Sequence, residues 1–148
     1  MHYELKKDDF TISTDNDKLD IGLIHYFLSK ESHWALNIPL EVVKRSNEGS
    51  LCFGVYHKKK QVGFARVISD LATIAYLGDV FILKEYRGLG LSKWLMNSIL
   101  KHPQLQGLRR WILLTKDAHT LYEKSGFKPV ANPDRYMELY NPDVYNNS

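Results

Sequence analysis

The stretch DVFILKEYRGLGLSKWLM, residues 79–96, decides how the chain folds. It begins with a short apolar run that favours a β-strand, residues 80–83, and from Leu91 onward its apolar residues follow helical spacing. Two glycines, Gly88 and Gly90, separate the two parts. A strand that passes through a glycine turn into a helix leaves backbone N–H groups unpaired at the helix start, where the helix dipole adds partial positive charge. The stretch therefore predicts an anion site for a phosphate or pyrophosphate.

The same stretch resembles the acetyl-CoA-binding signature of the GNAT superfamily of N-acetyltransferases, usually written Gln/Arg-x-x-Gly-x-Gly/Ala. Here it reads Arg87-x-x-Gly90-x-Ser92, with Ser92 where the family prefers glycine or alanine. A second motif, AHTLYEKSGF at residues 118–127, is similar to the family's Ala-x-x-Leu-Tyr-x-x-x-Gly-Phe ending. Two motifs at the right separation are far more specific than either alone, and the resemblance extends over roughly residues 51–140.

Length and composition are consistent with one domain over residues 1–148. A chain of 148 residues buries about two thirds of its unfolded surface, and a 44% hydrophobic share with three tryptophans predicts a packed core. Twenty Lys and Arg against seventeen Asp and Glu give +3, which weakly favours an anionic cofactor but does not by itself predict nucleic-acid binding.

Targeting and redox features are sparse. Cys52 stands alone, which excludes a disulfide framework and a cysteine metal cluster. The sequence shows no signal peptide and no apolar run of membrane length. We therefore expect a cytoplasmic protein that binds neither a membrane nor nucleic acid.

Hydrophobic patterning predicts an α+β fold, with two helices, an antiparallel meander, and then a β-α-β-α-β order. The resemblance adds a GNAT-like architecture, a mixed and largely antiparallel sheet that is flanked by helices and whose two parallel strands splay apart. Expected helices cover residues 19–28, 40–44 and 117–125, and a further helix begins at Leu91 with Pro103 as its far limit. Expected strands cover residues 10–13 after a loose end, 51–56, 62–68, 73–83 with a bulge at Gly78, 109–115, 127–131 and 135–140.

The resemblance implies acetyl-CoA as the cofactor. Backbone groups of the strand before the glycine loop would pair with the pantetheine amides like an added strand, and Arg87 with the loop amides would hold the pyrophosphate. The residues expected to bind the cofactor are Val80, Phe81, Ile82, Arg87, Gly88, Leu89, Gly90, Leu91, Ser92 and Tyr122.

Two residues are candidates for the proton transfers of acetyl transfer. The resemblance makes Tyr122 the acid, because the family often has a tyrosine here that points at the cofactor sulfur; core packing is the alternative. Asp79, a carboxylate inside an apolar strand, is the candidate base, and a structural ion pair with Arg66 is an equal alternative. Many relatives place a glutamate where Tyr76 stands, so a water chain is a further candidate for the base.

The acceptor pocket has candidates on several predicted elements. Trp34 lies in the loop between the first two helices, which in this family commonly covers the substrate. The remaining histidines lack metal-ligand spacing, so no metal is expected. The residues expected to contact the acceptor are Trp34, Arg66, Tyr76 and His119, with His33 as a further neighbour.

Other nucleotide-binding classes do not fit the glycine loop. A P-loop requires Gly-Lys-Ser/Thr, and a dinucleotide fold requires a third glycine where Lys93 stands. We expect transfer of an acetyl group from acetyl-CoA to a primary amine of a small molecule or peptide, by direct attack in a ternary complex. A non-catalytic acyl-CoA sensor stays open as the alternative. An exposed C-terminal strand edge is compatible with a homodimer.

Overall fold

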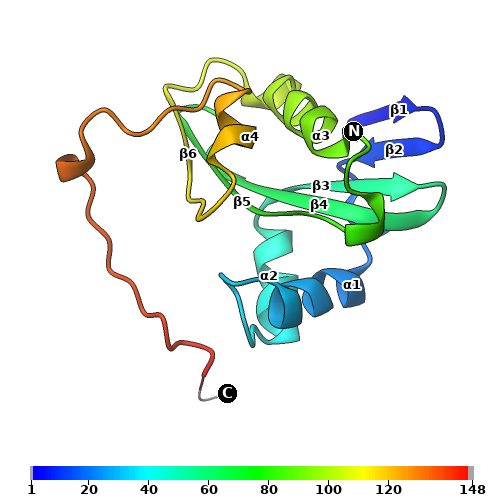
Figure 1. Cartoon of the computed structure of the whole chain (residues 1–148), viewed down its shortest axis with the longest axis horizontal. Helices are drawn as coiled ribbons and strands as arrows, with labels where there is room; N and C mark the ends of the chain where they lie inside the picture. The colour runs from blue at the N-terminus through cyan, green and yellow to red at the C-terminus, as the bar shows by residue number, and fades with distance from the viewer. Residues whose placement is uncertain (1, 147–148) are drawn as a thin grey trace.

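The computed structural model describes residues 2–146 and contains one six-stranded sheet whose strands are ordered as in the sequence (Figure 1). Every neighbouring pair is antiparallel except β5 and β6, which run parallel. The expected α+β fold with a mixed, largely antiparallel sheet is confirmed. The strands are β1 (Glu4–Lys7), β2 (Phe10–Ser13), β3 (Leu51–His57), β4 (Lys60–Ser69), β5 (Ile74–Ile82) and β6 (Arg110–Leu113).

Helices cover both faces of the sheet (Figure 1). On one face lie α1 (Ile21–Tyr26), which Asp20 caps and which continues as a π-helical turn (Phe27–Glu31), and α2 (Leu40–Glu48). On the other lie α3 (Leu91–Leu100) and α4 (His119–Glu123). Short 3-10 turns occur at Asn16–Lys18, Lys84–Tyr86, Pro103–Leu105 and Pro133–Arg135.

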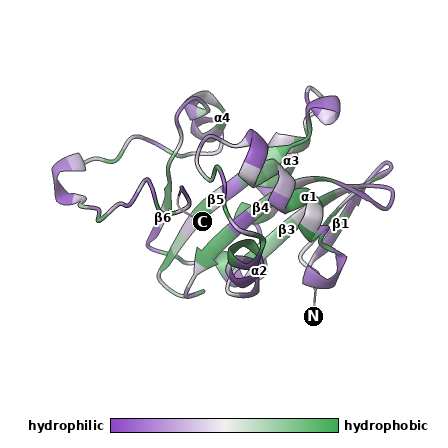
Figure 2. Cartoon of the chain, turned by 90° about the horizontal axis from the view of Figure 1, so that it is seen from below, coloured by the Kyte–Doolittle hydropathy of each residue, from purple (hydrophilic) through white to green (hydrophobic). Residues whose placement is uncertain are grey.

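The core consists of two clusters of buried side chains, one on each side of the sheet. Because both faces of the central strands are covered, these strands are apolar along most of their length (Figure 2). Phe53 and Val55 of β3 belong to the cluster under α3, whereas Cys52 of the same strand belongs to the cluster under α1 and α2. In the second cluster the rings of Phe27 and Phe81 stack with centroids 4.0 Å apart. Side chains that alternate along one strand thus fill both layers.

The bulge expected at Gly78 is present and falls on the residue that follows it. Arg66 pairs with Gly78 and Phe64 pairs with Phe81, so Asp79 and Val80 together oppose one residue of β4. Asp79 has φ of 55°, in the left-handed region. Beyond the bulge β5 continues to Ile82, although its pairing with β6 covers only residues 74–77. The end of β5 therefore has a strand partner on one side only.

Several local expectations differ from the structure. The expected loose end contains β1, which pairs along its whole length with β2. Residues 29–31 complete the π-helical turn instead of opening a loop. The parallel strand is shorter than residues 109–115 and only half-buried, because β6 is the last strand of the sheet.

The two strands expected at residues 127–131 and 135–140 do not form. After Gly126 the 3-10 turn Pro133–Arg135 is the only helical or strand element of the described chain, which extends away from the sheet (Figure 1). Pro129 and Pro133 lack a backbone donor and interrupt any pairing with β6 at that point. None of the helices within residues 2–146 is long and apolar enough to cross a membrane.

Candidate active site

The glycine loop leads from the end of β5 to the start of α3 and leaves its backbone bare. Gly88 and Gly90 have φ of +83° and +80°, and Gly90 is the N-cap of α3. A Cβ atom built on either glycine meets no heavy atom within 4 Å. A ligand can therefore approach the N–H groups at the N-terminus of a ten-residue helix, as the sequence predicted for an anion.

Arg87 is tied to the strand that precedes it. Its Nε donates a hydrogen bond of 2.9 Å to the backbone oxygen of Ile82. Arg87 forms no ion pair with any carboxylate among residues 2–146, so its terminal guanidinium nitrogens are available to an anion. Beyond the loop, Leu91 is buried against the core and Ser92 follows it in the first turn of α3.

A hollow of about 200 Å³ adjoins the loop, and the first hairpin forms its opposite wall. Lys7 and Phe10 from this hairpin are functional candidates that sequence reasoning missed. No local signal could identify them, because they precede the loop by some eighty residues and only the order of the sheet brings them near. The hollow is lined by Lys7, Asp8, Phe10, Leu89, Gly90, Leu91 and Trp94.

At the bulge, the Asp79 carboxylate accepts two hydrogen bonds from residues distant in sequence. Arg66 Nε donates to Oδ2 at 2.8 Å, and the indole Nε1 of Trp34 donates to Oδ1 at 2.8 Å. The Arg66 and Asp79 side chains are only 17% and 11% exposed, and Arg66 Nη1 also donates to Ser50 Oγ at 3.0 Å. The ion pair that sequence reasoning held as the alternative for Asp79 is therefore present. Asp79 also anchors the loop that carries Trp34.

Tyr76 completes this cluster on the sheet face toward α1 and α2. Its ring covers Gly78 so closely that a Cβ there would lie 3.1 Å from Tyr76 Cε1. Burial, and secondarily the Asp79 carboxylate, raises the pKa of the Tyr76 hydroxyl. Three of the four predicted acceptor contacts, Trp34, Arg66 and Tyr76, thus gather around Asp79.

The histidines predicted for the acceptor pocket lie apart from one another. The His33 ring packs edge-on against Trp34, with centroids 5.1 Å apart. His119 lies at the start of α4 and shares no hydrogen bond or ion pair with the Asp79 cluster in the described part of the chain. Its role at the acceptor stays a prediction.

Tyr122 is buried in the core cluster that also contains Leu91 and Leu95 of α3. Its ring packs edge-on against Phe127, with centroids 6.0 Å apart. Burial raises the pKa of its hydroxyl, so the phenol stays protonated over a wider pH range than in water. The aromatic body is thus part of the core, and nothing in this packing removes the hydroxyl's capacity to donate a proton.

Three features thus lie together: the exposed N–H groups at the start of α3, the unpaired edge at the end of β5, and the polar cluster around Asp79 at the bulge of β5. Comparison with known proteins shows the family to which a chain with these features belongs. The family model of the acetyltransferase (GNAT) domain matches residues 48–129, which include the bulge, the glycine loop and α4. The chain belongs to the GNAT family of acetyltransferases.

Individual relatives agree with this assignment. A protein of Gibberella zeae assigned to the acetyltransferases is 33% identical, over 79% of this chain and 77% of its own. The solved structure of a protein assigned to the GNAT acetyltransferases of Xanthomonas campestris pv. campestris is 56% identical with a TM-score of 0.90, over 92% of this chain and 96% of its own. A Clostridium acetobutylicum protein solved with acetyl-CoA shares the fold, with a TM-score of 0.64 at 14% identity over 95% of this chain and 96% of its own.

The loop geometry makes a prediction for Gly90→Glu. The added carboxylate enters the open space before α3, where it repels a pyrophosphate, so acetyl-CoA affinity should fall more than tenfold, over ~1.4 kcal/mol. Gly107→Glu is the matched control, because Gly107 also has a positive φ, +75°, and no heavy atom within 4 Å of its Cβ position. Calorimetric titration should show weaker binding for Gly90→Glu alone. Equal affinities in the two folded variants would refute the phosphate assignment.

Proposed function

We propose that the protein transfers an acetyl group from acetyl-CoA to a primary amine of a small molecule or peptide, by direct attack within a ternary complex and with the whole chain acting as one catalytic domain. The observation that carries this proposal is the bare backbone of Gly88 and Gly90 at the start of α3, directly after the free edge of β5. Family membership and a fold relative solved with acetyl-CoA support it.

The residues present fit the cofactor. The amides of residues 88–92 and the free nitrogens of Arg87 would hold the pyrophosphate, with Lys7 across the hollow as a second positive charge. The stretch Val80–Ile82 lies beyond the last residue that pairs with β6, so its free backbone groups can pair with the pantetheine amides. Bound there, acetyl-CoA supplies the thioester that an amine attacks.

Tyr122 serves as the acid in this proposal. A thiolate leaves when the amine displaces it, and a neutral phenol can protonate that thiolate. A phenol with the ordinary pKa of about 10 is neutral near pH 7, and burial raises the pKa of the Tyr122 hydroxyl further, so it is in the protonated form that the step requires. Tyr122 lies on α4 and belongs to the same core cluster as Leu91, the first residue of α3, so it lies on the side of the sheet where the glycine loop opens.

The amine must lose a proton, and Asp79 is the acceptor in this proposal, directly or through water. Both of its oxygens already accept a hydrogen bond, but an ionised carboxylate has about four lone-pair sites, so each oxygen can accept a further one. Trp34, Arg66 and Tyr76 surround Asp79 and form the acceptor side of the site.

Turnover with a pool of amines tests the proposal and separates an enzyme from an acyl-CoA sensor. The protein should release free thiol from acetyl-CoA only when an acceptor amine is present. Small amines, amino acids and peptides are assayed separately, since the site contains charged groups of both signs. Tight binding of acetyl-CoA without turnover on any amine class would favour the sensor.

The variant Tyr122→Phe deletes one hydroxyl and keeps the aromatic body. Acetyl-CoA affinity should be nearly unchanged, whereas kcat should fall by about one to three decades, on the order of 1.4–4 kcal/mol. Tyr56→Phe is the control, because Tyr56 is also buried and its hydroxyl has no hydrogen-bond partner in the structure. Single-turnover rates and melting temperatures are measured on both. A Tyr122→Phe protein with a lower melting temperature and an intact rate would assign this tyrosine to packing.

The variant Asp79→Asn keeps the shape and an acceptor oxygen for the Trp34 indole, but it removes the proton-accepting charge and sets an amide NH2 against the Arg66 Nε donor. If Asp79 is the base, kcat should fall roughly 10²-fold and the acidic limb of the pH–rate profile should be displaced. Trp34→Phe removes the donor to Asp79, keeps an aromatic ring on the acceptor side, and serves as the comparison. An equal loss in both variants, with no displacement of the profile, would assign Asp79 to holding the loop.

A further inference from the structure

Next to the Asp79 cluster, the same face of the sheet continues as an open apolar surface. Ile68 on β4 pairs with Tyr76 on β5, and Tyr76 pairs with Ile112 on β6, so the three side chains form one row across the sheet. Ile74, two residues before Tyr76, lies on the same face. Ile68 is 45% exposed and Ile74 is 40% exposed. These four residues form an apolar shelf that a ligand can cover.

Arg110 lies at the end of the apolar shelf that is farther from the bulge. It is the first residue of β6, and it pairs with Ile74. Trp111, the next residue, packs against the cluster under α3. Because side chains alternate along a strand, Arg110 faces the shelf. The acceptor side of the sheet thus has a carboxylate at one end and a guanidinium group at the other.

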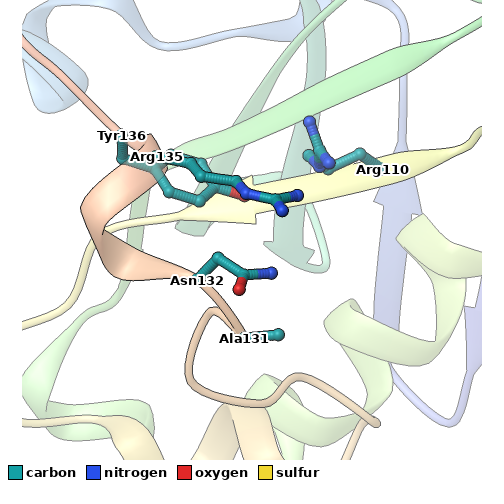
Figure 3. A pocket seen from close by; sticks show the side chains of 5 residues that line it. All are labelled: Arg110, Ala131, Asn132, Arg135 and Tyr136. Atoms are coloured by element: carbon teal, nitrogen blue, oxygen red, sulfur yellow. The ribbon is translucent and has the colours of Figure 1, made fainter.

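A hollow of about 340 Å³ opens beside Arg110, and the turn Pro133–Arg135 contributes to its wall. Figure 3 shows the side chains of Arg110 and Arg135 reaching toward each other, with the Asn132 amide near them. The Tyr136 ring packs on Arg110, with 6.0 Å between the ring centroid and the guanidinium carbon. Neither arginine forms an ion pair with a carboxylate among residues 2–146. Two such guanidinium groups at one hollow favour an oxyanion, which a guanidinium group can bind through two parallel hydrogen bonds.

The distance between the two ends of the shelf limits the length of a suitable ligand. Gly78, at the bulge, lies four residues from Ile74, the partner of Arg110. At about 3.3 Å per residue, these positions are about 13 Å apart along the strand. A free α-amino acid carries its amine and its carboxylate on one carbon atom, so it is too short to reach both ends. An extended chain of about four residues has the required length.

We propose that the acceptor is an extended amine with an apolar body and an oxyanion, carboxylate or phosphate, at its far end. The inference rests on the proposed transfer to an amine and names the acceptor of that same site. The amine lies at Asp79, the apolar body covers the shelf, and the oxyanion enters the hollow between Arg110 and Arg135. A short peptide with a free C-terminal carboxylate has this chemistry, as does a long alkylamine that ends in a phosphate.

Two matched pairs of acceptors test the preference. The first pair is the tetrapeptide Ala-Leu-Leu-Ala as the free acid and as the C-terminal amide, and the second is aminooctyl phosphate and aminooctanol. In at least one pair the anionic member should have a kcat/KM about tenfold higher or more, mainly through KM, because the oxyanion binds far from the thioester. The pair that shows the preference identifies carboxylate or phosphate as the anion. Added salt should reduce the preference, since both arginines are exposed.

Substitutions in the hollow test which residues cause the preference. Arg110→Gln and Arg135→Gln each remove one guanidinium group and should lower the preference for the anionic member by about tenfold. Arg109→Gln is the matched control, because Arg109 is the neighbouring exposed arginine and does not line the hollow. The control should keep the preference of the parent protein. An unchanged preference in both hollow variants would overturn the proposal.

Binding separates a failure of this inference from a failure of the proposed function. Calorimetric titration of the same four amines in the presence of CoA does not require turnover. Tighter binding of an anionic member that is lost in Arg110→Gln supports the oxyanion site, even if no thiol is released from acetyl-CoA and the proposed function fails. Equal affinities within both pairs overturn the oxyanion site, whether or not thiol is released.

Discussion

The contact on which the site depends is the pair of hydrogen bonds that Asp79 accepts at the bulge of β5. Asp79 has a left-handed backbone, which costs a residue other than glycine about 1–3 kcal/mol. Such a conformation persists only where neighbouring contacts stabilise it. Arg66 from β4 and Trp34 from the loop before α2 hold it here. The pairing of β5 with β6 ends at Leu77, directly before the bulge, so the last residues of β5 have no partner on that side. One local distortion thus produces a free strand edge on one side and an anchored loop on the other.

The sequence predicted those parts of the fold that depend on local chemistry. The glycine loop, the antiparallel pairing of β3 and β4, and the bulge next to Gly78 all follow from residues whose backbone preferences are narrow. The ion pair between Asp79 and Arg66 was foreseen as an alternative because a carboxylate in an apolar strand requires a partner.

Features set by long-range geometry were not accessible to the same reasoning. β1 is polar and mostly exposed, so its sequence carries no strand pattern, and it forms because β2 supplies a partner. Lys7 reaches the glycine loop only through the order of the sheet. The alternation at residues 135–140 predicts a strand, and this prediction is wrong, because a strand requires a paired neighbour and these residues pair with none within residues 2–146.

The coincidence of strand order with sequence order bears on how the protein is synthesised. Three of the five strand pairs, β1 with β2, β3 with β4 and β4 with β5, join antiparallel segments separated by short turns, whereas residues 14–50 with α1 and α2 separate β2 from β3, and a crossover through α3 separates β5 from β6. Short-range pairings close with little loss of chain entropy, so a nascent chain can form the hairpin of β1 and β2 and the meander of β3, β4 and β5 as each leaves the ribosome. The crossover that brings β6 beside β5 closes after α3 has been synthesised, and β6 pairs with β5 alone within residues 2–146.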